Sequence, residues 1–276
     1  MSGRSNAEAA KLKAAATYNA AADHFDDEPL GFWARIGWRT IERLDLPLGA
    51  TVLDVGCGTG ASALPAAEKI GPRGRVIGVD LAENLLAIAR QKAASRGLAN
   101  LQFETGDMGR LGYPDGHFDA VVSVFSIFFV PDMAAQAREL WRMVRPGGTL
   151  AITTWGPRVL EPGTTAWWSA VEEVRPDLVN TVSPWDRITE PAALRALLRD
   201  AGIAGVEIVT EEGYQTLRSP EDWWAIVLGT GFRWTVEQMG REAAEQVRSA
   251  TLAQLRRGAV DAVETNALFA TARKSA

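Results

Sequence analysis

Apolar positions in residues 51–155 follow two alternating spacings. Short, almost continuous apolar runs are typical of strands buried on both faces, and longer stretches with apolar residues every three or four positions are typical of helices packed on a sheet. Strands and helices that alternate in this way form a parallel, doubly wound sheet. The pattern predicts strands at 51–55, 75–79, 101–104, 119–124 and 149–154, with helices at about 60–70, 82–96 and 132–144.

The flanking segments are mostly helical by the same criterion. Residues 7–46 predict helices that precede the sheet and cover it, so residues 1–48 are interpreted as a helical lid and residues 49–155 as a ligand-binding core. Residues 156–276 are interpreted as the rest of the same domain, with helices that cap a substrate and the last two strands. The elements predicted there are helices at 164–174 and 191–201, a strand at 206–210, a helix begun by the capping box Ser219-Pro-Glu-Asp222, a helix capped by Thr235 and running to about Arg257, and a final strand at 262–272.

Composition narrows the class of protein. The 276 residues are 47% apolar and 23% charged, which is typical of one soluble globular domain with an elaboration. A net charge of −5 argues against nucleic acid as a partner, because such a partner requires a basic face. The single cysteine, Cys57, indicates a reducing compartment, and no run of 18 apolar residues predicts a membrane span, so we expect a cytoplasmic location. Seven of the ten tryptophans follow residue 154, which indicates a substrate surface in the second half.

The segment Val52–Gly60 carries the main chemical signal. It is an apolar strand that runs into a turn with glycines at three alternate positions, Gly56, Gly58 and Gly60. Glycines there allow φ > 0 and let a ligand approach the backbone more closely than a Cβ would permit. Asp54 lies inside the strand, where a carboxylate must be paired, and we expect it to brace the turn through its amides.

A second acidic position predicts the kind of ligand. The strand beginning at Arg75 ends in Asp80, at the place where open α/β folds hold ribose hydroxyls, so the ligand is predicted to be a nucleoside. The stretch Gly56–Ala61 also satisfies the dinucleotide pattern G-x-G-x-x-A, which leaves a dehydrogenase as an alternative. A phosphate-binding loop requires a lysine after its glycines, and this chain has none there.

Five segments occur along the chain in one order: Leu53–Gly60, Gly78-Val-Asp80, Gly106-Asp107-Met108, Phe118–Val122 with Val130-Pro-Asp132, and Arg145-Pro-Gly-Gly148. Together they resemble the class I S-adenosylmethionine-dependent methyltransferases. The similarity is to the small-molecule group that includes the ubiquinone and menaquinone biosynthesis methyltransferases (methyltransferase type 11 domain), and it covers residues 15–155 well. Asp54 and Gly106-Asp-Met108 have no role in a dinucleotide fingerprint and favour this family over the dehydrogenase.

The resemblance implies a fold, a cofactor and a set of cofactor-binding residues. The fold is a Rossmann-like seven-stranded α/β sheet whose last strand is antiparallel and inserted beside the fifth, and the cofactor is S-adenosylmethionine. By resemblance the glycines face the methionine moiety, Asp80 binds the ribose, and Leu81, Asp107 and Met108 surround the adenine. The cofactor-binding residues implied are Tyr18, Asp54, Gly56, Cys57, Gly58, Gly60, Asp80, Leu81, Gly106, Asp107, Met108, Val124 and Phe125.

Catalysis by this family is an in-line displacement that depends chiefly on orientation. Relatives often carry a histidine pair after the fourth strand, where this chain has Phe128 and Phe129, which predicts an apolar, aromatic acceptor cavity. His24 in the lid is the candidate general base, against its interpretation as a solvated helix position, and His117 is interpreted as a turn residue. No metal is expected. The predicted substrate-pocket residues are Trp33, Trp155, Trp223, Phe128 and Phe129.

The predicted function is therefore methyl transfer from S-adenosylmethionine to a small, apolar or aromatic acceptor. Two alternatives stay open: a protein that binds the nucleoside without turnover, as a sensor or partner subunit, and a methyltransferase that acts on protein or RNA. The acidic charge and the lack of an appended recognition domain disfavour the second alternative. Nothing in the sequence sets an oligomeric state.

Overall fold

The computed structural model describes residues 2–180 and 182–276, with side chains from Glu8 onward. Its centre is a seven-stranded sheet in the order β3-β2-β1-β4-β5-β9-β6, in which β9 is antiparallel to both β5 and β6. This confirms the predicted fold class and the inserted antiparallel strand. The strands are β1 (Thr51–Val55), β2 (Arg75–Asp80), β3 (Leu101–Thr105), β4 (Phe118–Val124), β5 (Val144–Trp155), β6 (Glu207–Glu211) and β9 (Ala267–Arg273).

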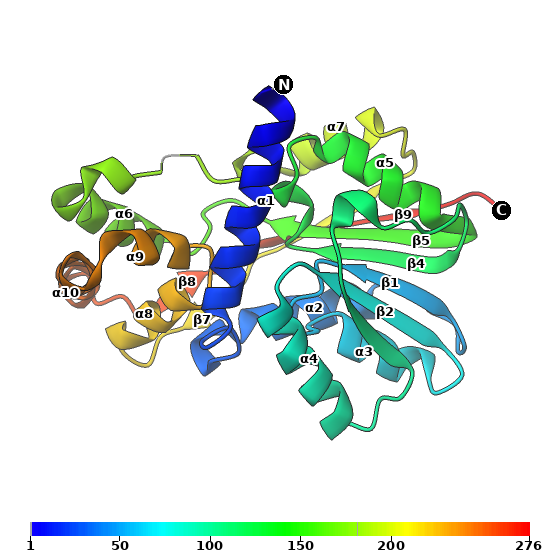
Figure 1. Cartoon of the computed structure of the whole chain (residues 1–276), viewed down its shortest axis with the longest axis horizontal. Coiled ribbons are helices and arrows are strands. Elements are labelled where there is room, and N and C mark those ends of the chain that lie inside the picture. The colour runs from blue at the N-terminus through cyan, green and yellow to red at the C-terminus, as the bar shows by residue number, and fades with distance from the viewer. Residues whose placement is uncertain (1, 181) are drawn as a thin grey trace.

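Helices cover both faces of this sheet (Figure 1). Successive residues of a strand point to opposite faces, so Val52 joins the core under α3 while Leu53 joins the larger core under α5. The helices packed on the sheet are α3 (Ala63–Ile70), α4 (Glu83–Ser95), α5 (Met133–Met143) and α7 (Pro191–Asp200). Asp132 caps α5 by accepting a hydrogen bond from the Ala135 amide at 2.9 Å, as its position before the helix predicts.

The N-terminal segment passes over the sheet edge that holds the site. Helix α1 (Ser2–Ala21) crosses between the sheet and the C-terminal helices (Figure 1), and η1 (Glu28–Leu30) and α2 (Phe32–Glu42) follow it. Asn19 at the end of α1 is tied to the first turn of α4, since its side-chain oxygen accepts from the Asn84 amide at 2.9 Å. The segment 1–48 that was interpreted as a lid therefore lies on the core, as far as the structure describes it.

The C-terminal half adds a helical cap beside the sheet. It consists of α6 (Gly163–Val174), η4 (Pro176–Leu178), η5 (Asp186–Ile188), α8 (Pro220–Leu228), α9 (Arg233–Met239), α10 (Arg241–Arg257) and a two-stranded sheet of β7 (Tyr214–Thr216) and β8 (Ala262–Glu264). Trp167 and Trp223 are fully buried inside this cap and pack against Phe232. The cap thus has an aromatic core of its own.

Several predicted boundaries in this half are wrong. The helix expected from Thr235 to Arg257 is two helices, because Gly240 has φ 75° and ends α9; Thr235 lies inside α9 rather than at a cap. The expected final strand is divided into β8 and β9, and β7, which pairs with β8, was not predicted. Ser219 makes no side-chain cap, and Asp222 accepts from the Arg218 amide instead.

Residues 60–62 also differ from their prediction, since α3 begins only at Ala63. The glycine turn uses the intervening residues to carry the chain from the sheet edge to the helix.

Among the helices that the structure describes, none has the length and apolar character needed to cross a membrane.

Candidate functional site

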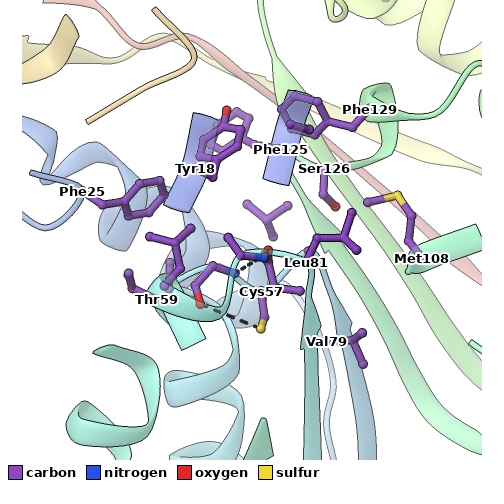
Figure 2. Close-up of a pocket in the computed structure, with 18 of the residues that line it drawn as sticks. Tyr18, Phe25, Cys57, Thr59, Val79, Leu81, Met108, Phe125, Ser126 and Phe129 are labelled. Atoms are coloured by element: carbon purple, nitrogen blue, oxygen red, sulfur yellow. Dashed lines mark hydrogen bonds between the residues drawn. The ribbon is translucent and has the colours of Figure 1, made fainter. Parts of the chain in front are cut away.

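A cavity lies at the carboxyl ends of β1, β2 and β4, beneath α1, and holds about 880 Å³ of empty space with its open mouth included. Figure 2 shows the glycine turn on one side and the aromatic rings of Tyr18, Phe125 and Phe129 on the other. The carboxyl ends of parallel strands are where open α/β folds bind ligands. Of the predicted cofactor residues, those that line it are Tyr18, Gly56, Cys57, Gly58, Asp80, Leu81, Gly106, Met108, Val124 and Phe125.

The glycine turn forms the floor of this cavity. Gly56 has φ 73°, and a Cβ built on it would lie 2.3 Å from the Cβ of Ser126, the residue that follows the end of β4 by two positions. The Gly56 amide donates to the Val79 carbonyl at 2.7 Å, which joins the turn to β2. Only a residue without a side chain fits between these two neighbours, so Gly56 holds the ends of β1, β2 and β4 together.

Asp80 is the carboxylate at the edge of the cavity. One of its oxygens accepts from the Gly58 amide at 2.8 Å and the other from the Ala82 amide at 2.9 Å. Burial raises its pKa, and these backbone hydrogen bonds act in the opposite direction. Each carboxylate oxygen has two lone pairs, so Asp80 keeps acceptor positions for hydroxyl groups of a ligand.

Asp54 does not brace the glycine amides, and that expectation is wrong. Its carboxylate accepts from the Ser62 hydroxyl at 2.7 Å, so it holds the start of α3, and it does not line the cavity. The amide of Gly58 is held by Asp80 instead. Asp54 is only 1% exposed, and burial raises its pKa to about 7.

Gly60 and Asp107 also lie outside the lining of the cavity. One Asp107 oxygen accepts from the Gly109 amide at 2.9 Å, and the other lies 3.3 Å from Lys11 Nζ on α1. Its neighbours Gly106 and Met108 do line the cavity. In this structure the Asp107 carboxylate therefore joins helix α1 to the segment after β3.

The wall opposite the glycine turn is aromatic. Phe125 has φ 52°, a conformation that is rare for a bulky residue, and its ring stacks on Trp155 with centroids 4.2 Å apart. Trp33 packs edge-on against Phe125 and stacks on Phe25 at 5.4 Å. Unfavourable backbone conformations of this kind persist where neighbours hold them, and they concentrate at functional sites.

A second cavity begins beyond Tyr18 and Phe129. It holds about 1530 Å³ of empty space with its open mouth included, and it lies among α1, η3 (Ile127–Phe129), α6, residues 177–180 and 183–187, and α9. The rings of Tyr18 and Phe129 are 5.5 Å apart and line both cavities. Burial raises the pKa of Tyr18, so its hydroxyl stays protonated at neutral pH.

The predicted substrate residues are divided by the structure. Phe128 and Phe129 line the second cavity, and Trp33 and Trp155 line a smaller recess that adjoins it. Trp223 lines none of these three spaces: its ring is 0% exposed and packs against Gly163, so the expectation for Trp223 is wrong. Trp168, Trp185 and Trp234 also line the second cavity, and they belong to the tryptophan-rich second half that was expected to form a substrate surface. Thr230, which lines the recess, was not singled out by the sequence.

The two histidines lie outside these spaces. His24 Nδ1 is 2.7 Å from Asp27 Oδ2, and His24 lines neither the cavities nor the recess. The structure therefore does not place the candidate base where an acceptor would react. His117 stacks on Tyr113 and packs edge-on against Phe118 near the start of β4. No group of metal-ligating side chains of suitable geometry occurs in the part of the chain that the structure describes.

Comparison with known proteins identifies the family. A model of the methyltransferase domain matches residues 52–148, the segment that builds β1 to β4 and the glycine turn. The chain is 32% identical over 250 residues to nocamycin O-methyltransferase of Saccharothrix syringae, and the match covers 82% of this chain and 87% of that protein. The chain belongs to the S-adenosylmethionine-dependent methyltransferases.

Two further comparisons give the extent of the methyltransferase's similarity to known proteins. Demethylmenaquinone methyltransferase of Geobacillus kaustophilus is 36% identical over 139 residues, which cover 49% of this chain and 59% of that protein. The crystal structure of a cyclase, SpnF, is 28% identical, has a TM-score of 0.55, and matches over 88% of this chain and 80% of its own. The predicted resemblance to the quinone-biosynthesis group is thus confirmed.

Proposed function

We propose that the methyltransferase binds S-adenosylmethionine in the cavity at the carboxyl ends of β1, β2 and β4, and a small, apolar or aromatic acceptor in the second cavity. The observation that carries the proposal is that the two cavities share Tyr18 and Phe129 as lining residues. A methyl donor and an acceptor bound on either side of this boundary are neighbours. Neither cavity alone would place two reactants side by side.

The residues of the first cavity fit a nucleoside with a charged amino-acid tail. Gly56 and Gly58 offer bare backbone, Asp80 offers oxygens to the ribose, and Leu81 and Met108 offer apolar surface to the adenine. Asp54, Gly60 and Asp107 are proposed to support these residues rather than to contact the cofactor. Tyr18 would close the cavity from the lid.

S-adenosylmethionine supplies an activated methyl group when it is bound. The protein then has to align the acceptor and exclude water, and orientation of this kind lowers barriers by up to about 7–11 kcal/mol in ideal cases. The second cavity contains no histidine among its lining residues, and its carboxylate, Asp177, is paired with Arg175 at 2.7 Å. We therefore assign the chain an orienting role, in which the acceptor reacts through its own nucleophilic atom without a histidine base.

Calorimetry with S-adenosylhomocysteine, the demethylated product, tests the first cavity. The Asp80→Ala variant removes the hydrogen-bond acceptors for the ribose, and we expect its affinity to fall roughly 10- to 100-fold, as for hydrogen bonds to a charged group. Asp119→Ala is the matched control. The Asp119 carboxylate also accepts a hydrogen bond from a backbone amide, that of Thr51 at 2.7 Å, but it lies at the amino ends of β1 and β4, away from the cavity. Equal losses in both variants, or no binding by the unaltered protein, would contradict the proposal.

A second candidate is cofactor binding without methyl transfer. One comparison favours it, since SpnF is named as a cyclase although it is 28% identical to this chain. An assay with methyl-labelled cofactor over metabolite, protein and RNA fractions separates the candidates. We expect label in the small-molecule fraction; label in none of the fractions would favour the second candidate, and label in protein or RNA would reverse the assignment of acceptor class.

The setting of the reaction is also part of the proposal. The negative net charge supports a function without nucleic acid, and the single cysteine supports a cytoplasmic location. We further propose that residues 1–48, 49–155 and 156–276 act as lid, cofactor core and acceptor cap of one domain. The boundary shared by the two cavities is consistent with that division, because Tyr18 comes from the first segment and Phe129 from the second.

A further inference from the structure

The recess behind the aromatic wall contains two buried polar atoms without a partner. Trp33 Nε1 and Thr230 Oγ1 make no hydrogen bond to any residue that the structure describes, and Thr230 is only 5% exposed. Other buried polar atoms also lack partners, for example those of Thr154 and Trp167, but those residues line none of the spaces at the site. An unpartnered buried donor or acceptor is costly unless a ligand or water satisfies it.

This recess adjoins both of the larger spaces. It shares Tyr18, Trp33 and Phe125 with the cofactor cavity, and it shares Tyr18, Phe128 and Trp185 with the second cavity. A group held by Trp33 and Thr230 therefore lies beside the cofactor cavity, while the rest of the same molecule extends outward into the second cavity.

The outer end of the second cavity is positively charged. Lys13 and Arg187 line it, and neither forms an ion pair with a residue in the described part of the chain. Lys13 lies 4.9 Å from the ring centre of Trp234 and five residues before Tyr18 on α1, which corresponds to about 7.5 Å along the helix axis. The carboxylate on this wall, Asp177, is already paired with Arg175.

Between these two ends the walls carry aromatic side chains. Trp168, Trp185 and Trp234 line the second cavity together with Phe128 and Phe129. Aromatic walls of this kind favour a flat, aromatic ligand by stacking and edge-to-face contacts. The space thus has a hydrogen-bonding inner end, an aromatic middle and a cationic mouth.

We infer that the acceptor is an elongated aromatic acid, bound with an oxygen at Trp33 and Thr230 and with its anionic group at Lys13 and Arg187. This inference rests on the proposed function and names the acceptor class of the same site. The inner oxygen is the atom that lies next to the cofactor cavity, and the acid group at the mouth selects and orients the molecule. Thr230 is accordingly a specificity-determining residue.

Four small probes test both ends separately, by calorimetry on protein saturated with S-adenosylhomocysteine. The probes are naphthalene, 2-naphthol, 2-naphthoic acid and 6-hydroxy-2-naphthoic acid, which differ only in a hydroxyl and a carboxylate. In the unaltered protein we expect the hydroxyl to strengthen binding roughly three- to tenfold, the range of one neutral hydrogen bond. We expect the carboxylate to add roughly two- to fivefold, as for exposed charge pairs.

Matched variants assign each gain to its residues. Thr230→Val should abolish the gain from the hydroxyl and keep the gain from the carboxylate; Thr154→Val is its control, because it removes another unpartnered buried hydroxyl away from the site. Lys13→Gln combined with Arg187→Gln should abolish only the gain from the carboxylate, and Arg199→Gln, on an exposed face of α7, should abolish neither. The melting temperature of Thr230→Val should stay equal or rise, since an unpaired hydroxyl is replaced by a methyl group.

The outcomes separate this inference from the proposed function. If S-adenosylhomocysteine does not bind, both are overturned. If it binds and the four probes bind equally, or the hydroxyl gain survives in Thr230→Val, only the acceptor assignment is overturned. The assignment is established if Thr230→Val loses only the gain from the hydroxyl and the Lys13→Gln, Arg187→Gln double variant loses only the gain from the carboxylate.

Discussion

The cavity proposed to bind the cofactor and the cavity proposed to bind the acceptor differ in how their residues are arranged along the chain. The floor of the first comes from consecutive residues, Gly56 to Thr59, and from the ends of neighbouring strands in one sheet. The walls of the second come from α1, η3, α6, residues 177–180 and 183–187, and α9, most of which are far apart in the sequence. Backbone geometry builds the first site, and packing between distant side chains builds the second.

This difference explains which residues tolerate change. In the cofactor cavity the constraint is steric and local, since Gly56 has no room for a Cβ beside Ser126. In the cap the fully buried Trp167 and Trp223 keep the helices together, while Trp168, Trp185 and Trp234 face the acceptor space. A substitution in the first region should therefore affect folding and cofactor binding together, and one in the cap core should affect stability alone.

Gly56→Ala should give the largest effect. The new Cβ would lie 2.3 Å from Ser126 Cβ, and φ at this position is 73°. Overpacking and left-handed backbone together should lower the free energy of unfolding by about 2–5 kcal/mol and abolish binding of S-adenosylhomocysteine. Chemical denaturation and calorimetry measure the two quantities.

Gly49→Ala is the control that measures the cost of the left-handed backbone conformation alone. Gly49 has φ 84° but no atom within 4 Å of a Cβ placed there, so it should cost only about 1–2 kcal/mol and leave cofactor binding unchanged. Similar behaviour of the two variants would show that the contact between the turn and Ser126 is not what shapes the site.

Asp54→Asn should change how stability depends on pH. Burial raises the pKa of Asp54 to about 7 in the folded chain, whereas an unfolded aspartate titrates near 3.9. Between these two pH values the unfolded chain has released a proton that the folded chain keeps. Asp54 therefore makes the free energy of unfolding fall as pH rises from about 4 to about 7, by up to about 4 kcal/mol. Above about pH 7 this contribution no longer changes with pH.

The Asp54→Asn variant cannot ionise at this position, so its free energy of unfolding should lack this contribution to the pH dependence. Denaturation of both proteins at pH 5, 6, 7 and 8 gives the comparison, and the difference between them should grow in favour of the variant up to neutral pH. A difference that is the same at every pH would mean that Asp54 is ionised in the folded protein throughout this range.

Gly163→Ala should give a smaller effect than Gly56→Ala, and one confined to stability. A Cβ there would lie 2.3 Å from the ring of Trp223, which is fully buried. We expect a loss of about 1–3 kcal/mol in the free energy of unfolding from overpacking. Affinity for S-adenosylhomocysteine should be unchanged, because the contact is in the core of the cap. A clear loss of affinity would show that the two regions are coupled.

The core was predictable from the sequence because its signals are local. Strand and helix spacing in residues 51–155 predicted the order of elements, and glycines followed by Asp80 predicted the position of the cavity. The cap was less predictable, since tertiary contacts override local spacing there: Gly240 divides one expected helix, and pairing with β7 separates β8 from β9.

The sequence by itself determined the fold class, the family and the end of the sheet where the cavity proposed for the cofactor lies, because a turn without side chains and an acidic strand end are encoded in neighbouring residues. Only the tertiary structure decided that Asp80 rather than Asp54 holds the Gly58 amide, that Trp223 is core and Trp185 is cavity wall, and that Thr230 is left without a partner. Such distinctions depend on which side chains from distant parts of the sequence come into contact, and the spacing of residues along the chain does not specify those contacts.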